Sequence, residues 1–393
     1  MPEFLPAIVV VAYNRPRSLQ RLLTSINKAH FPNQDIPLII SIDRATDNQA
    51  VLALAQAHPW PHGEKKVLYQ EANLGLRKHV LQCGDLTRAH GSIIMLEDDL
   101  YVSPLFYEYA VQALNFSADD LRIGGVSLYN HQLNVHARKN FAPLEDGYDN
   151  WYFQFASSWG QAWTEDQWSR FRNWYAEDHH LAANAAIPQN VRDWSEKSWL
   201  KYFIAFLIET DRYFLYPKIS LTSNFSDTGT HVGEDSTAFQ LPLLYAHKKQ
   251  YHFSPLSKSG AVYDAFFENT ALADHLGLER KALCVDLYKY RSPSELKGYP
   301  YVLTGQQLPY QVLKTFGRSL KPMDANILED IEGNDLALYS TESPGPGHAM
   351  EHNRFRELSY HLKEVKRNEA FILWKHLAKR RAKHLWKKLT GLK

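Results

Sequence analysis

The chain has 393 residues, of which 45% are hydrophobic and 22% are charged, a composition typical of a globular protein rather than a disordered one. Its 44 basic and 43 acidic side chains nearly cancel, which argues against a nucleic-acid-binding protein. Two cysteines, Cys83 and Cys284, are too few for a disulfide framework and fit no zinc motif, so we expect a cytoplasmic protein. Neither a signal peptide nor a transmembrane helix is predicted.

Strands and helices are predicted to alternate in the first hundred residues. Strands are expected at 7–13, 37–42, 66–69 and 93–96. Helices are expected from Ser18, which would be the N-cap, over 47–57, and from the segment 73–78 that opens the next one. Polar residues follow the strands: Asn14 and Arg15 after the first, and Asp43 after the second. This alternation predicts an α/β fold with a doubly wound, Rossmann-like nucleotide-binding sheet.

Three consecutive carboxylates, Glu97, Asp98 and Asp99, follow the predicted strand at 93–96. Adjacent carboxylates repel one another unless a cation or hydrogen-bond donors compensate them. Their hard oxygen atoms suit Mg²⁺ or Mn²⁺, ions that proteins often hold with one or two carboxylates together with substrate phosphates. The pattern predicts a cation site at the sheet edge, although a solvated acidic turn would look the same.

The second half of the chain is less regular. Strands are expected at 125–130 and 213–222 and a helix at 198–207, with a tryptophan-rich segment at 151–174. The tryptophans there are expected to divide between the core and a platform for a bound acceptor. Residues 336–353 contain Pro-Gly-Pro-Gly and are predicted to form a linker.

The C-terminal tail differs from the rest of the chain in charge. From residue 366 to 393 it carries ten Lys or Arg residues and one acid, Glu369, interleaved with Leu, Phe and Trp. A basic amphipathic helix of this kind is suited to an anionic membrane surface, or to packing on the body or on an acidic protein.

Several segments, in order, resemble the GT-A glycosyltransferases, among them N-acetylglucosaminyltransferase I and bacterial family 2-like enzymes of polysaccharide assembly. Val-Val-Val-Ala-Tyr-Asn-Arg-Pro at 9–16 is similar to the first strand that reaches the nucleotide, and Ser-Ile-Asp at 41–43 to the second. Leu-Glu-Asp-Asp-Leu at 96–100 resembles the metal motif of the family. Asn130 and Trp159-Gly160 resemble its acceptor-side segments.

The resemblance implies roles for particular residues. Asp99 would be the ligand of Mn²⁺ or Mg²⁺. The nucleotide-sugar site would be formed by Tyr13, Asn14, Arg15, Asp43, Arg77, Lys78, Glu97, Asp98 and His231, the last of these in the glycine-containing loop 228–235. Asn130, Trp159 and Gly160 would lie on the acceptor side.

An inverting transfer also needs a carboxylate that accepts the proton of the acceptor hydroxyl. In the resembling family this is an Asp immediately before a Trp, whereas here Lys197-Ser198 precede Trp199. Glu196 is the first candidate because of its spacing to the next strand, and Asp193 is the second. Either carboxylate could instead cap the following helix.

The resulting expectation is a metal-dependent inverting glycosyltransferase that uses a UDP-sugar and a glycan or lipid-linked acceptor in bacterial surface polysaccharide synthesis. Residues 1–130 would form the nucleotide-sugar half, 131–335 the acceptor half, and 354–393 a helical tail that holds the enzyme on the inner face of the cell membrane. The alternatives are a glycan-binding protein that has lost turnover and a nucleotidyltransferase. The latter is disfavoured because the segment after the first strand, Ala-Tyr-Asn-Arg-Pro, is not a glycine-rich phosphate loop.

Overall fold

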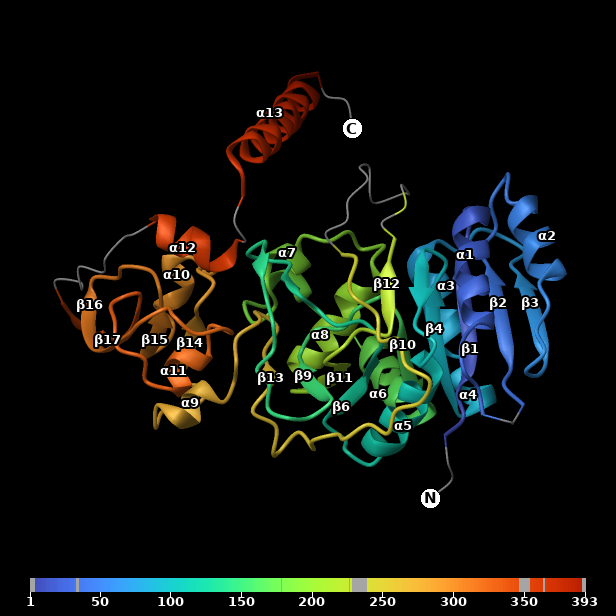
Figure 1. The fold of residues 1–393 in the computed structure, drawn as a ribbon, viewed down its shortest axis with the longest axis horizontal. Coiled ribbons are helices and arrows are strands. Elements are labelled where there is room, and N and C mark those ends of the chain that lie inside the picture. Colours follow the sequence, from blue (N-terminus) through green and yellow to red (C-terminus); the bar gives the residue numbers. More distant parts are fainter. Residues whose placement is uncertain are drawn as a thin grey trace.

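The computed structural model describes residues 4–32, 35–177, 179–225, 227, 239–345, 354–362 and 365–390 (Figure 1). A nine-stranded sheet forms the centre of the protein. In spatial order its strands are β13 (Val262–Tyr263), β9 (Asn150–Phe153), β11 (Tyr213–Pro217), β6 (Ile123–Ser127), β10 (Gln161–Thr164), β4 (Ser92–Glu97), β1 (Ala7–Ala12), β2 (Leu38–Ile42) and β3 (Lys65–Tyr69). The predicted α/β fold with a largely parallel sheet is confirmed.

Helices cover both faces of this sheet. One face carries α1 (Pro16–Asn27), α2 (Gln49–Ala57) and α5 (Phe106–Ser117), and the other α3 (Leu76–Gly84), α6 (Glu165–Tyr175) and α8 (Trp199–Glu209). β1 is buried along its whole length, and its side chains alternate between the two layers: Val9 and Val11 join the α3, α6 and α8 core, whereas Ile8 and Val10 join the other. This period of two is why its β-branched run forms a strand buried on both sides.

The strand directions bring several polar loops to one edge of the sheet. β1, β2, β3 and β4 run parallel, and β10 lies antiparallel between β4 and β6, so β6 again runs in the direction of β4. β11 is parallel to β6 and antiparallel to β9. The carboxyl ends of β1, β2, β4, β6 and β11 therefore share an edge with the start of β10, the edge at which such sheets bind ligands.

Smaller elements lie around the large sheet. They are the two-stranded sheet β5 (Leu100–Val102) with β12 (Thr222–Asn224), the hairpin β7 (Leu133–Asn134) with β8 (Lys139–Asn140), and the short helices α4 (Thr87–His90), η1 (Leu181–Ala183) and α7 (Gln189–Arg192). The strand predicted over 213–222 is thus two strands in different sheets. Ser18 does not cap α1, which begins at Pro16, because proline is favoured in the first turn of a helix.

A second, four-stranded sheet follows, in the order β14 (Leu283–Asp286), β15 (Tyr301–Thr304), β17 (Leu336–Pro344) and β16 (Tyr310–Phe316). The short helices α9 (Leu272–His275), α10 (Pro293–Leu296) and α11 (Ala325–Leu328) accompany it. The predicted linker was wrong over 336–344, because β17 is an inner strand that pairs with both β15 and β16. Its first four residues are fully buried, which the nearby Pro-Gly-Pro-Gly run obscured.

The C-terminal region is helical, as predicted, and consists of α12 (Arg354–His361) and α13 (Arg367–Thr390). Figure 1 shows α12 packed against the second sheet, whereas α13 stands away from the other elements. No helix in the described part of the chain is long and apolar enough to cross a bilayer.

Candidate functional site

The carboxylates after β4 lie beside the loop that follows β1. The backbone N–H of Asp98 donates to Val11 O at 3.1 Å, and the N–H of Asp43 donates to Ala12 O at 3.0 Å, so both strand ends flank that of β1. The guanidinium of Arg15 donates to Asp99 Oδ2 at 3.1 Å and also binds Asp98 Oδ1. The structure thus brings together three of the predicted site residues.

Electrostatics at this cluster are unbalanced. Burial raises the pKa of Asp98 to about 6 against the opposing charge of Arg15. Desolvation, followed by repulsion from Asp99 and Asp98, raises the pKa of Glu97 well above its usual range. Burial and mutual repulsion thus disfavour the charged forms of Glu97 and Asp98, and an additional cation would stabilise those charged forms.

Asp99 provides a specific observation that fits a metal ion. Its Oδ1 atom is buried and has no hydrogen-bond partner among the described residues, while its Oδ2 is bound by Arg15. A buried carboxylate oxygen without a donor is costly, and a hard divalent cation would satisfy it. Among the described residues, no group of three or more His, Cys, Asp or Glu side chains is arranged to hold a metal, so Asp99 would share the ion with phosphate oxygens of a substrate.

Asp43 is buried at the end of β2 and organises the start of α3. Its Oδ1 accepts from Leu74 N at 2.8 Å and its Oδ2 from Gly75 N at 2.9 Å. Gly75 has a φ of 73°, a conformation that glycine adopts without the strain of a Cβ. Asp43 therefore holds the loop before α3 in place, and its predicted contact with a nucleotide base stays a prediction.

The other predicted donor-site residues lie around the same edge. Tyr13 and Asn14 are exposed after β1, and the carbonyl of Tyr13 accepts from Asn48 Nδ2 at 2.9 Å. Lys78 is exposed on α3. Arg77 instead points to α8, where it donates to the hydroxyl of Tyr202 at 2.8 Å. His231 lies outside the described residues.

The two candidate bases differ in what they contact. Glu196 accepts from Lys201 Nζ at 2.6 Å and from the hydroxyl of Tyr202, which also binds Arg77. These contacts connect Glu196 to the start of α3 at the ligand edge. Asp193 is exposed at the end of α7 and accepts from Gln189 Nε2 at 2.7 Å. Hydrogen bonds from Lys201 and then Tyr202 lower the pKa of Glu196, which keeps its carboxylate ionised at neutral pH.

Sequence reasoning missed Lys201 and Tyr202. Lys201 is buried in α8, whose sequence WLKYFIAFLIE is otherwise apolar over its first ten positions. A lysine in such a run requires a nearby partner, because an unpaired buried ammonium is costly. This signal could have pointed to Glu196, its partner across the helix start.

The acceptor-side residues form a tight backbone arrangement. Gly160 has a φ of 95°, and a Cβ there would lie 2.8 Å from Thr222 Cγ2. Thr222 Oγ1 donates to the carbonyl of Trp159 at 2.5 Å. Asn130 is buried, donating to Lys218 O at 2.7 Å and accepting from Trp151 Nε1 at 3.1 Å. Both the nitrogen and the oxygen of the Asn130 side-chain amide thus bond to groups of the protein itself.

The tryptophans of the segment 151–168 differ in burial. Trp151, Trp163 and Trp168 are at most 1% exposed and belong to the core on the α3, α6 and α8 side. Trp159 is partly buried, with its ring 4.6 Å from that of Tyr129. Trp159 is therefore the tryptophan of the segment 151–168 best placed to meet an acceptor.

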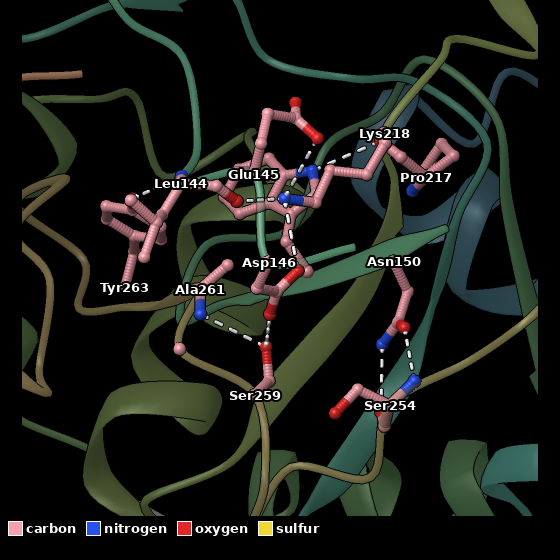
Figure 2. Close-up of polar contacts among 12 residues, drawn as sticks. Leu144, Glu145, Asp146, Asn150, Pro217, Lys218, Ser254, Ser259, Ala261 and Tyr263 are labelled. Carbon is pink, nitrogen blue, oxygen red and sulfur yellow. Dashed lines mark hydrogen bonds and ion pairs between the residues drawn. The ribbon is translucent and has the colours of Figure 1, made fainter. Parts of the chain in front are cut away.

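A network around Lys218, not anticipated from the sequence, braces the far end of the same edge (Figure 2). Lys218 follows β11 and donates to the carbonyl of Leu144, with Asp146 Oδ1 at 3.5 Å and Glu145 Oε2 at 3.7 Å. Asp146 Oδ2 in turn accepts from Ser259 Oγ at 2.8 Å. The Lys218 ammonium and Asp146 thus join three segments that are distant in sequence, at residues 144–146, 218 and 259.

The segment after β12 packs on α1. Asp227 accepts from Ser18 Oγ at 2.7 Å and pairs with Arg21, whose guanidinium carbon lies 3.8 Å from the ring centre of Phe225. Ser18 is therefore used for this contact rather than for capping α1. The contacts hold Asp227, which directly precedes the glycine-containing loop 228–235 in the sequence, against α1.

Comparison with known proteins gives a family match and a set of distant structures. Residues 7–174 match the family model "Glycosyl transferase family 2". No curated protein sequence matches the chain. The matched region runs from β1 to α6 and so contains the Arg15 loop, the three carboxylates and Trp159-Gly160.

The solved structures that resemble the chain do so weakly. S. aureus TarS 1-349 is 14% identical to this chain, covers 56% of this chain and 60% of its own length, and has a TM-score of 0.37. The structure of TarS 1-349 in complex with UDP-GlcNAc is 13% identical, covers 55% of this chain and 57% of its own length, and has a TM-score of 0.35. The mannosyltransferase PcManGT from Pyrobaculum calidifontis, in complex with GDP-Man and Mn²⁺, is 15% identical over 42% and 46%, with a TM-score of 0.30. This chain thus spans less than two thirds of the length of each.

The narrower likeness to N-acetylglucosaminyltransferase I stays a prediction. The match over β1 to α6 includes the part of the sheet that carries the carboxylate cluster. Residues 7–174 of the chain therefore carry a region that matches glycosyl transferase family 2, in a mixed α/β fold with a largely parallel central sheet.

Proposed function

We propose that the protein is a metal-dependent, inverting glycosyltransferase that transfers a sugar from a UDP-sugar to a glycan or lipid-linked oligosaccharide in bacterial surface polysaccharide synthesis. The observation that supports it best is the buried, unpartnered Oδ1 of Asp99 in a carboxylate cluster opposite Arg15. Residues 1–130 would bind the donor and 131–335 the acceptor.

The residues of the cluster would have separate tasks. Asp99 would hold Mn²⁺ or Mg²⁺, and Glu97 and Asp98 would contact the ribose, the sugar or metal-bound water. When bound, the cation supplies charge that stabilises the departing diphosphate. Arg15 lies where it could turn from Asp99 to a phosphate, and so would help to orient the leaving group.

Glu196 is our choice for the base. It is ionised at neutral pH, and its partner Tyr202 connects it through Arg77 to the donor edge. In the reaction, Glu196 would accept the proton of the acceptor hydroxyl as that oxygen attacks the anomeric carbon and the bond to the diphosphate breaks. Trp159 would offer an aromatic face to the acceptor sugar.

A calorimetric titration tests the donor site. UDP, GDP, CDP and dTDP are added with and without Mn²⁺ to the wild type, to Asp99→Asn and to a control, Asp166→Asn, whose carboxylate is exposed on α6. We expect UDP to bind only with Mn²⁺, and Asp99→Asn but not Asp166→Asn to abolish binding. No metal-dependent binding of any of the four nucleotides would refute the proposal.

A glycan-binding protein without turnover is the second candidate, because both oxygens of Glu196 are already engaged by Lys201 and Tyr202. It would retain metal and nucleotide binding without transfer to any acceptor.

We also propose that the basic tail binds anionic membranes, so that the enzyme is peripheral on the inner face of the cell membrane. The apolar side chains Phe371, Ile372, Leu373, Trp374 and Leu377 of α13 are all exposed, alongside the cations of the tail. Such a helix is stabilised by lying in the interface of a bilayer. Deletion of 366–393 should release the protein from vesicles that contain phosphatidylglycerol, and unchanged binding would contradict this part of the proposal.

A further inference from the structure

Helix α12 presents opposite faces to the protein and to solvent. Its inner face carries Glu357 and His361, which are both buried. Its outer face carries Phe355 and Leu358, and Leu362 follows directly, at the spacing i, i+3, i+7 of one helical stripe. Phe355 is 79% exposed and Leu362 55% exposed. We call Phe355, Leu358 and Leu362 the outer stripe.

The inner face of α12 is fixed to the body by ion pairs and hydrogen bonds. Glu357 lies between Lys139, at 3.3 Å, and Lys289, at 3.0 Å. Asn140 Nδ2 donates to the carbonyl of His361 at 2.5 Å, and the hydroxyl of Tyr360 donates to the carbonyl of Leu320. The direction in which the outer stripe points is therefore set by the body of the protein.

The position of α12 relates this stripe to the candidate site. Lys139 and Asn140 form β8, in the hairpin that leaves the carboxyl end of β6, and that end lies at the ligand edge of the large sheet. Figure 1 likewise shows α12 and α13 on the side of the molecule where β12 lies. A surface that contacted the outer stripe would therefore face the same side as the proposed acceptor site.

An exposed row of large apolar side chains is unusual on a protein surface and indicates an interaction site. In the sequence, the outer stripe is followed by Val365, which is also exposed, by the basic residues Lys366 and Arg367, and by the exposed apolar residues of α13. Apolar side chains next to a strongly basic segment match the interface of an anionic bilayer better than a protein surface.

We infer that the outer stripe of α12 is a second membrane contact, which inserts into the interfacial layer of an anionic bilayer and orients the ligand edge toward it. This rests on the proposed membrane role of α13. Binding of α13 would keep α12 near the surface, so the weaker contact of the short helix becomes effectively intramolecular. α13 would supply attachment, and α12, fixed through Glu357, would supply orientation.

Vesicle flotation with phosphatidylglycerol tests the contact in the full chain. The double variant Phe355→Glu with Leu358→Glu is compared with Leu121→Glu, an exposed leucine before β6 at the opposite edge of the sheet. We expect the double variant to bind about tenfold more weakly, because two apolar side chains no longer leave water, and Leu121→Glu to bind like the wild type. Circular dichroism and UDP titration would verify that each variant is folded.

A fluorescent label shows whether the stripe itself enters the bilayer. Cys83 and Cys284 are buried, and burial raises the pKa of both thiols to about 12, so an introduced cysteine reacts selectively. A polarity-sensitive dye at Leu358→Cys should shift to the blue on addition of vesicles, whereas the same dye at Leu121→Cys should not.

The outcomes separate this inference from the proposals on which it rests. If deletion of 366–393 abolishes binding, but the α12 variants bind like the wild type and the label at 358 does not shift, α12 is not a membrane contact although the tail proposal stands. If the wild type does not bind vesicles, the α12 inference and the tail proposal both fail. The proposed donor site is tested separately, by calorimetry. If Leu358→Glu instead converts a dimer to a monomer in sedimentation, the stripe is a subunit interface and the inference is wrong.

Discussion

Arg15 Nη1 lies 3.1 Å from Asp99 Oδ2, so the loop after β1 is joined to the carboxylates after β4 by an ion pair between adjacent strands. The same guanidinium binds Asp98, which is buried. Arg15 is thus the internal counter-ion of the cluster.

Removing this counter-ion should destabilise the protein in a way that a divalent cation repairs. Arg15→Gln is expected to lower the free energy of unfolding by about 1–3 kcal/mol, because buried carboxylates lose a charged partner. Mn²⁺ should recover part of this loss by taking the place of the guanidinium. Thermal unfolding with and without Mn²⁺ measures both effects.

Arg17→Gln is the matched control, because Arg17 is exposed in the same turn of α1. An equal loss of stability in the two variants, or no effect of Mn²⁺ on Arg15→Gln, would show that Arg15 does not compensate the cluster.

The identity of the base can be decided by two isosteric variants. Glu196→Gln should lower kcat by about 100-fold or more while leaving UDP affinity unchanged, because the amide cannot accept the acceptor proton. Asp193→Asn should stay within a few-fold of the wild type, since Asp193 accepts from Gln189 at the start of the same short helix. Steady-state kinetics and UDP titration would measure this, and the opposite pattern would assign the base to Asp193.

Gly160 is predicted to be intolerant of a side chain for two separable reasons. Gly160→Ala should cost about 2–4 kcal/mol, because alanine is strained at a φ of 95° and its Cβ would meet Thr222 Cγ2. Gly277→Ala should cost only about 1 kcal/mol, because Gly277 has a φ of 67° but no atom within 4 Å of a Cβ. Urea unfolding gives both values.

Thr222→Ser tests the steric part of that cost. It removes Cγ2 but keeps the hydroxyl that donates to the carbonyl of Trp159. Gly160→Ala should therefore lower the free energy of unfolding by less in the Thr222→Ser background than in the wild type. Equal losses in both backgrounds would show that only the backbone matters.

The attachment of α12 should depend on pH through Glu357. Burial alone would raise the pKa of Glu357, but the hydrogen bond and charge of Lys289, with the charge of Lys139, lower it to about 2. Because the folded pKa lies below the usual value of 4.5, the stabilisation is complete above pH 4.5 and is lost as the pH falls toward 2.

The difference in unfolding free energy between the wild type and Glu357→Gln should therefore be about 1–3 kcal/mol and constant above pH 5, and should shrink at lower pH. Glu329→Gln, at an exposed position, serves as the control. A difference that does not change between pH 7 and pH 3 would mean that the charge of Glu357 does not hold α12.

Much of the fold of the first hundred residues could be predicted because its elements are marked by local sequence. The strands β1, β2 and β4 are short apolar runs, and the polar residues at their ends mark the ligand edge. The placement of β10 between β4 and β6 could not be predicted, because it depends on pairing Gln161 with Met95 and with Ser127, contacts far apart in sequence.

The sequence predicted which residues lie at the candidate site better than it predicted which residues they contact. Asp98 and Asp99 meet Arg15, but Asp43 is engaged by backbone N–H groups of the next loop, and Arg77 binds Tyr202 rather than facing open solvent. These partners depend on how α3 and α8 pack together, which no local pattern encodes. Lys201 in an apolar helix was the one local sign of such a contact.

The inner position of β17 determines where the chain can be shortened. A truncated chain that ended before residue 336 would leave β15 and β16 with no strand between them, because each of them pairs with β17. Ending it after residue 345 would keep the sheet but remove Glu357, leaving Lys139 and Lys289 without the carboxylate that both contact. An expression boundary at residue 365 retains the second sheet and α12 together, and is the shortest form in which loss of membrane binding could be attributed to α13 alone.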